Sequence, residues 1–374
     1  SRSRVTGSRG YDGWTAAPGK AARREPSPGK RGRRPDVSLF LSLLSAIAAV
    51  APPPVEGVWV DKGLPGNWAG TSAVLSEAGV DHVLPCLLYG VSPAYPSSLV
   101  PVSEAFPPDT GWANDLIAEC SARGIEVHAW VILWKANRAD GVFLDSLARE
   151  GRLQVDCSGD TLPWLCPTDP RNLALEEALV LELLDRFPLD GVQFDYVRFP
   201  GAESCCCQGC RDRFARSTGL SPGAWPEDVL PGGRFHREFG LWRADRITHA
   251  LVLLSMAAGG RGAAVSAAVL PDRADALGCG QDWSLWGRSG VLDRIYFMNY
   301  FRTAAELDSV ISGQADGLTC GTPAVCGLGT GIGRLEVSPE EARRQVETAI
   351  GAGFSGVCHF HLNQTLLRTL ASAP

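Results

Sequence analysis

The chain has 374 residues and a hydrophobic content of 45%, which is enough for one large core. Its formal net charge is −6, but residues 1–36 hold ten Lys and Arg against three acids, so they carry +7 and the remaining chain carries −13. An acidic body of this kind argues against nucleic acid as the main partner.

Residues 1–54 are predicted to precede the fold. The basic cluster Lys30–Arg34 is followed by an apolar run over 37–51, which has the length of a signal-peptide core and is too short to span a bilayer. The prolines at 52–54 indicate a linker and argue against a helix packed on the fold. We expect residues 1–54 to be mostly disordered. We expect the processed protein to be secreted, periplasmic or in the cell envelope, without a stable membrane span.

From Val55 onward, short apolar stretches alternate with helical patterns. Strands are predicted at 55–61, 81–88, 125–133, within 190–200, and at 263–270, 292–299, 324–328 and 356–361. Helices are predicted at 72–78, 111–123, 141–150, 172–187, 235–258, 281–289, 304–312, 339–352 and 364–370. Ser338 is the expected N-cap of the helix at 339–352, and residues 201–232 form a long excursion.

Eight strands alternating with helices predict an α/β fold, a single (β/α)8 TIM barrel over residues 55–374, with elaborated loops after strands 2, 3 and 4. Connections longer than a dozen residues in a compact fold usually form a functional rim. The sequence shows no Gly-rich turn of a dinucleotide-binding fold, and no cofactor is expected.

The most informative segment is 190–200, with the sequence DGVQFDYVRFP. Val192 and Phe194 alternate with polar residues as in a buried strand. Asp195 follows them at the carboxyl end, where barrel enzymes place their chemistry, with Tyr196 and Arg198 beside it. The alternative is that Asp195 only caps the following turn.

Residues along and after the strands are acids, aromatic residues and amide or imidazole donors. Such a set is typical of a sugar site, because aromatic rings stack on the apolar faces of pyranoses and carboxylates serve as acid, base or nucleophile. We therefore expect a polysaccharide or oligosaccharide substrate. The predicted substrate-binding residues are Asp61, Tyr89, His128, Trp130, Trp134, Tyr196, Arg198, Trp283, Asn299, Tyr300, His359 and His361.

Ordinary glycoside hydrolysis requires two carboxylates. Asp195 is predicted to be the nucleophile or charge stabiliser, kept ionised by Tyr196 and Arg198. Asp282 is predicted to be the acid, because the neighbouring indole could withdraw it from water and raise its pKa. Capping of the helix that follows is an equally good interpretation of Asp282. Asp61 is a weaker candidate for the same role.

The histidines have alternative interpretations. His128 lies inside a strand and is either a substrate contact or a core residue. His359 and His361 alternate on the last strand, which predicts that both side chains face the same side and could provide two ligands of a metal site. A ligand-binding or structural role is the preferred interpretation, because no third ligand has diagnostic spacing.

Twelve cysteines are compatible with an oxidising compartment. Two pairs are close enough in sequence to close short loops, Cys157 with Cys166 and Cys320 with Cys326. A separate cluster has the spacing CxC followed by CxxC, which fits either a structural zinc site or a loop disulfide. The residues of this cluster are Cys205, Cys207 and Cys210. A structural staple is favoured over a redox role, because a thioredoxin-like context is missing.

The chain also contains HAW at 128–130, LPWLCPTDP at 162–170, CCCQGCRDRF at 205–214, QDWSLW at 281–286 and FMNY at 297–300. Together with the segment at 190–200, these resemble the family-10-like glycosyl hydrolases, which are secreted bacterial barrel proteins. The resemblance implies a TIM barrel that hydrolyses O-glycosidic bonds of a polysaccharide, with cell-wall glycan as one candidate. It places the family's strand-four acid on Asp195 and the acid of its QDW segment on Asp282. The chain departs from the family pattern at Gln193, where histidine is frequent, and along 358–361.

Two alternatives to a glycosidase remain open at this stage. The first is a carbohydrate-binding barrel that keeps the aromatic residues but lacks a pair of catalytic acids. The second is a metal-dependent carbohydrate deacetylase or hydrolase that uses His359, His361 and an acid.

Overall fold

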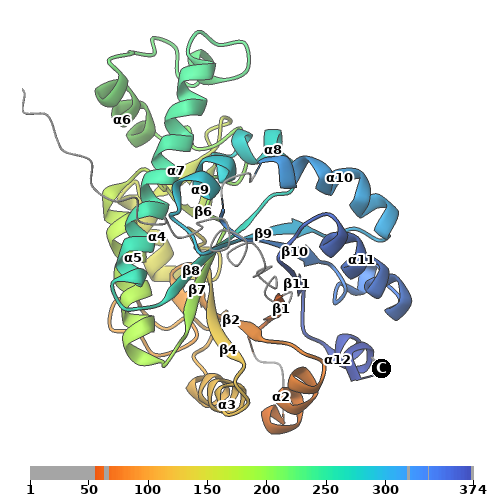
Figure 1. Ribbon diagram of the computed structural model, residues 1–374. Coiled ribbons are helices and arrows are strands. Elements are labelled where there is room, and N and C mark those ends of the chain that lie inside the picture. The colour runs from red at the N-terminus through yellow and green to blue at the C-terminus, as the bar shows by residue number, and fades with distance from the viewer. Residues whose placement is uncertain (1–54, 63–66, 318–320, 336, 372–374) are drawn as a thin grey trace, which may run out of the picture. The chain divides into compact units, whose positions relative to one another are not determined.

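Parallel strands form the centre of the molecule (Figure 1). The computed structural model describes residues 55–62, 67–317, 321–335 and 337–371; the predicted leader and linker at 1–54, and Cys320, lie outside them. The described barrel strands are β1 (Val55–Val60), β2 (His82–Tyr89), β4 (Glu126–Ile132), β7 (Gly191–Asp195), β8 (Ala264–Val269), β9 (Arg294–Asn299), β10 (Ala324–Leu328) and β11 (Gly356–His359). Each pairs in parallel with its neighbours, and β1 pairs with both β2 and β11, which closes the sheet. The predicted (β/α)8 barrel is confirmed.

Helices surround the strands on the outside of the barrel (Figure 1). They are α2 (Trp68–Glu77), α3 (Thr110–Ser121), α5 (Pro170–Arg186), α7 (His236–Gly259), α9 (Trp283–Ser289), α10 (Ala304–Gly317), α11 (Pro339–Gly351) and α12 (Gln364–Ala371). Local signals set their ends. Asp169 caps α5, whose first residue is Pro170, and Ser338 caps α11 by accepting the N–H of Glu341 at 3.2 Å, as predicted.

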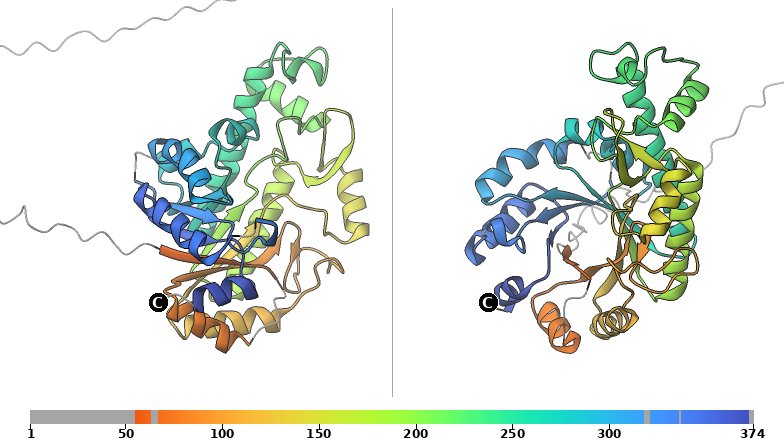
Figure 2. Two further views of the ribbon diagram at one scale, coloured as in Figure 1. Left: turned by 90° about the vertical axis from the view of Figure 1, so that its right-hand side faces the viewer. Right: turned by 180° about the vertical axis from the view of Figure 1, so that it is seen from behind.

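Three connections at the carboxyl ends of the strands are elaborated, as predicted. After β2, the short strand β3 (Ser92–Pro93) folds back antiparallel to it. After β4 come α4 (Gly141–Arg149) and a hairpin of β5 (Leu153–Val155) and β6 (Thr161–Leu165). After β7 come α6 (Gln208–Thr218) and the 3-10 turn η1 (Glu227–Val229). Figures 1 and 2 show α6 and the start of α7 projecting beyond the barrel.

The sequence patterns did not predict the β5–β6 hairpin, α6, or the short helices α8 (Arg273–Gly278) and η2 (Gly333–Leu335). The hairpin strands have three and five residues, which is too short for a clear alternation. Helix α6 buries only Cys210 and Phe214, so it has almost no apolar face to detect. Within the part of the chain that the structure covers, no helix combines the length and apolarity needed to cross a membrane.

Two buried histidines fill the amino-terminal end of the barrel interior. His82 Nε2 lies 2.9 Å from the hydroxyl of Tyr296, and the His128 ring lies 5.9 Å from that of His82. The space for both rings comes from glycines on the neighbouring strands. A Cβ at Gly57 would lie 2.1 Å from His82, and a Cβ at Gly191 would lie 2.4 Å from His128 Nδ1. His128 is therefore a core residue at the end of the barrel opposite the predicted site.

Candidate active site

Asp195 is the last residue of β7 and is only 6% exposed. Its Oδ2 accepts a hydrogen bond from Trp130 Nε1 at 3.1 Å, and its Oδ1 accepts one from the backbone N–H of Tyr196 at 2.6 Å. Burial raises the pKa of Asp195, against the opposing effects of the Tyr196 N–H, the charge of Arg198 and the indole of Trp130. Because burial outweighs these partners, the carboxyl holds a proton more readily than an ordinary Asp, which suits proton transfer.

The backbone is strained where this site is built. Tyr196 has φ of 57° and Trp134, after β4, has φ of 65°, and these are the two non-glycine residues with positive φ in the described chain. The left-handed conformation costs an L-residue roughly 1–2 kcal/mol and is concentrated at functional positions. At Tyr196 it turns the backbone N–H onto the carboxyl of Asp195. The N–H of Trp134 is held by Glu176 Oε1 at 2.8 Å.

A hollow of about 370 Å³ opens beside this carboxyl at the ends of β1, β2 and β4. Its lining residues are Asp61, Lys62, Cys86, Tyr89, Ala105, Phe106, Pro107, Trp130, Ile132 and Arg138. Trp130 connects the hollow to Asp195, because Trp130 lines the hollow and its indole N–H donates to the Asp195 carboxyl. Asp61 contributes a second carboxylate and forms an ion pair with His361 Nδ1 at 3.0 Å, which raises the pKa of His361.

We call the open end of the barrel around Asp195, where the strands have their carboxyl ends, the mouth. Aromatic rings form two walls of this mouth. In the first, Phe360 stacks on Tyr300 with 5.1 Å between ring centroids and meets Trp130 edge-on at 5.8 Å. In the second, the ring of Trp164 lies 5.4 Å from that of Tyr196. Rings of this kind can stack on the apolar faces of sugars.

Cations lie over several of these rings. Lys135 Nζ is 4.0 Å from the ring centroid of Trp164 and 4.5 Å from that of Tyr196. The Arg138 guanidinium is 4.1 Å from the Tyr89 centroid. Burial, and then the charges of Arg198 and Arg138, lower the pKa of Lys135. The mouth of this acidic protein is therefore locally cationic.

The structure brings seven of the predicted substrate-binding residues to the neighbourhood of Asp195. They are Asp61, Tyr89, Trp130, Tyr196, Arg198, Tyr300 and His361. Arg198 acts on Asp195 through its charge, because its Nη1 donates to the carbonyls of Phe199 and Pro200. The expectation that Arg198 and Tyr196 keep this carboxyl ionised is corrected in one respect: they oppose the shift, but burial is the largest effect.

The other five predicted binding residues have buried side chains. His128 lies beside His82 at the amino-terminal end of the barrel interior, and Trp134 is fully buried. Trp283 is 1% exposed and packs edge-on against Phe297 at 5.0 Å. Asn299 exchanges side-chain hydrogen bonds of 2.8 and 3.0 Å with Gln314 on α10. Both faces of a parallel strand are buried, so the sequence pattern does not show which residues point into the barrel.

His359 and His361 are separated, contrary to the expectation that they face the same side. His359 Nε2 lies 3.0 Å from Glu56 and its Nδ1 lies 2.8 Å from Thr330 Oγ1, in a hollow lined by residues of α11 and α12. His361 contacts Asp61 at the mouth instead. The two imidazoles therefore do not form the ligand pair that a metal-dependent deacetylase or hydrolase would require.

Asp282 lies at the start of α9, where its Oδ1 accepts the N–H of Leu285 at 3.1 Å. This is the capping interaction that was weighed against catalysis, and catalysis by Asp282 remains a prediction. Gln193, the departure from the family pattern, is buried in the barrel interior and accepts a hydrogen bond from the indole of Trp59.

Sequence reasoning missed several residues of the mouth. Lys135 follows Trp134 at the end of a strand, so the rule that selected Trp134 could have selected it. Phe360 lies between the two predicted histidines. Lys62 directly follows Asp61 at the end of β1, so the same rule could have selected it. The others, Phe106, Arg138 and Trp164, come from long connections whose course is decided by tertiary packing.

No family model matches the chain, and no curated protein sequence matches it either. Solved structures share its fold. The PgaB (BpsB) glycoside hydrolase domain from Bordetella bronchiseptica aligns with a TM-score of 0.64 at 14% identity, over 86% of this chain and 98% of that one. A β-galactosidase from Marinomonas ef1 aligns at 0.63 with 10% identity, over 85% of this chain and 58% of that one. A β-galactosidase from Rahnella sp. R3 aligns at 0.62 with 13% identity, over 87% and 55%. The chain thus spans little more than half the length of these galactosidases, and at such identities the likeness concerns the fold.

Proposed function

We propose that this protein is a glycoside hydrolase that cleaves O-glycosidic bonds of a polysaccharide, with Asp195 as its central catalytic carboxyl. The observation that carries the proposal is the placement of Asp195. It is a buried acid with a raised pKa, at the carboxyl end of a barrel strand and between aromatic walls. The fold it shares with glycoside hydrolases supports the proposal.

The raised pKa of Asp195 favours a role in proton transfer over the predicted role of nucleophile. The second carboxyl is either Asp61 or Asp282. Asp61 is favoured by its position, because it lines the hollow that Trp130 shares with Asp195. Asp282 is favoured by the family resemblance but is engaged as a helix cap. Retention of the anomeric configuration would indicate carboxyls roughly 5 Å apart, and inversion a separation of about 6.5–9.5 Å.

The cations at the mouth, Lys62, Lys135, Arg138 and Arg198, favour an anionic glycan, because clefts lined by one sign of charge attract the opposite sign. Acidic polysaccharides therefore belong in a substrate screen beside bacterial cell-wall glycans. Action outside the cytoplasm is part of the proposal and rests on the apolar run at 37–51.

The test is release of reducing ends by the wild type and by three Asp→Asn variants. Asp195→Asn should reduce turnover by about 10²–10⁴-fold while the thermal unfolding curve stays close to that of the wild type. Asp61→Asn and Asp282→Asn then identify the partner. Asn caps a helix about as well as Asp, so loss of activity in Asp282→Asn would reflect chemistry and not folding. Unchanged turnover in Asp195→Asn contradicts the proposal, and glycan binding without turnover in the wild type would indicate a binding barrel.

A further inference from the structure

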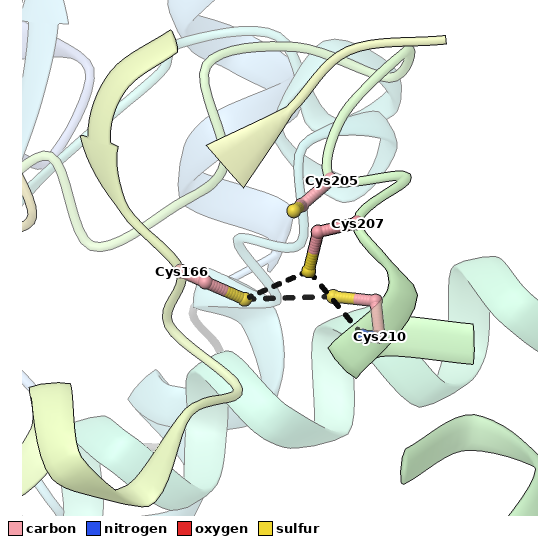
Figure 3. A group of neighbouring side chains, drawn as sticks. All are labelled: Cys166, Cys205, Cys207 and Cys210. Atoms are coloured by element: carbon pink, nitrogen blue, oxygen red, sulfur yellow. Dashed lines mark hydrogen bonds between the residues drawn. The ribbon is translucent and has the colours of Figure 1, made fainter. Parts of the chain in front are cut away.

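Four cysteines from two separate connections converge beside the mouth (Figure 3). Cys166 follows β6 and precedes α5, so it belongs to the connection after β4. Cys205 and Cys207 belong to the connection after β7, and Cys210 lies in the first turn of α6. All four are buried, and their Sγ atoms lie within 4.8 Å of one another.

The sulfur spacing fits a tetrahedral metal site. Zinc–thiolate bonds of about 2.3 Å in a tetrahedron put neighbouring sulfur atoms about 3.8 Å apart. Cys166 Sγ lies 3.5 Å from Cys210 Sγ and 3.9 Å from Cys207 Sγ, on either side of that value. A disulfide bond would require about 2.05 Å. The four thiols therefore surround a common centre and are not joined in pairs.

Hydrogen-bond donors surround the same sulfur atoms. The backbone N–H of Val155 donates to Cys205 Sγ at 3.4 Å, and that of Cys210 donates to Cys207 Sγ at 3.4 Å. Arg213 Nη2 donates to Cys166 Sγ at 3.6 Å. Thiolate ligands of a metal usually receive such outer contacts, which orient them and reduce the negative charge of the centre. The cluster thus has the surroundings of a thiolate site as well as its spacing.

We propose that Cys166, Cys205, Cys207 and Cys210 bind one structural Zn²⁺ ion. Four thiolates leave no open coordination position, so the ion is not part of the chemistry. It links the connection after β4 to the connection after β7. Cys166 lies two residues after Trp164, whose ring packs against Tyr196, so the ion fixes the aromatic wall next to Asp195. This inference holds whether or not the barrel hydrolyses glycans.

The test is the metal content of the full chain, purified without chelators and measured by elemental mass spectrometry. The wild type should contain one equivalent of zinc per chain. Cys166→Ser and Cys210→Ser should each lose it. The matched control is Cys206→Ser, because Cys206 is also buried in the same segment but its Sγ contacts the carbonyl of Glu203 at 3.9 Å and lies outside the cluster. This variant should keep the full equivalent.

A second measurement keeps the test valid if the variants fail to fold. Wild-type protein stripped of metal and reloaded with Co²⁺ should show the strong thiolate-to-cobalt absorption and visible bands of a tetrahedral thiolate site. After metal removal and alkylation, peptide mass mapping should show free thiols at these four positions. Stoichiometric iron would overturn the assignment to zinc. Disulfides within the cluster, wild-type protein without metal, or equal loss in the Cys206 control would overturn the site itself.

Discussion

The hydrogen bond from Trp130 to Asp195 should set part of the pKa of that carboxyl. Trp130→Phe removes the N–H that donates to Oδ2 at 3.1 Å and keeps an aromatic ring against Phe360, which meets the indole at 5.8 Å. The indole N–H stabilises the ionised carboxylate, so its loss should raise the pKa of Asp195 further above its ordinary value.

The size of the shift follows from the strength of the bond. Hydrogen bonds to charged groups contribute about 1.5–3 kcal/mol. One pKa unit corresponds to about 1.36 kcal/mol, so the expected rise is about 1–2 units. A distance of 3.1 Å is longer than the 2.7–2.9 Å usual for charge-assisted hydrogen bonds. The expected rise in the pKa of Asp195 is therefore about one unit.

Two assays measure this shift. The first is the limb of the kcat/KM pH profile that Asp195 controls, and the second is titration of its ¹³C-labelled carboxyl by NMR, which requires no substrate. Trp164→Phe is the matched control, because that ring packs on Tyr196 and Lys135 in the same mouth. The control should titrate like the wild type. A Trp130→Phe profile that overlies the wild type, or an equal shift in the control, would refute the reasoning.

Two predictions concern the stability of the scaffold. Burial raises the pKa of Glu176 to about 8. The stability that Glu176 contributes is therefore fully present below the ordinary Glu pKa, and it is lost as the pH rises toward the raised pKa of about 8. Relative to wild type, Glu176→Gln should gain about 1.4 kcal/mol per pH unit between about pH 5 and 7 in urea unfolding, and parallel curves would contradict this. Gly191→Ala should destabilise the fold by about 1–3 kcal/mol, because the new Cβ would lie 2.4 Å from His128 Nδ1 and 2.7 Å from the carbonyl oxygen of Ala264. Its control, Gly240→Ala on α7, meets no atom within 4 Å and should stabilise by about 0.5–1 kcal/mol. A Gly191→Ala protein that is as stable as the wild type would count against this view of the barrel core.

The barrel could be predicted because its determinants are local. Eight apolar stretches with strand lengths, separated by helical patterns, define the alternation that only a few folds accommodate. Ser338 could be recognised as a helix cap, because capping depends on residues within one turn. Asp195 could be located because the end of a strand is a local feature and the carboxyl ends of parallel strands lie on one side of the barrel.

The direction of each side chain was decided by tertiary structure. Asn299 bonds outward to Gln314 on α10, whereas Tyr300, the next residue, packs against Phe360 beside Asp195. The cysteine cluster shows the same division over a longer distance. The sequence by itself determined that Cys205, Cys207 and Cys210 are near one another, because they lie in the first turn of α6 and in the short segment directly before it. Only the fold added Cys166, since two connections that are separate in the chain meet where neighbouring strands end side by side.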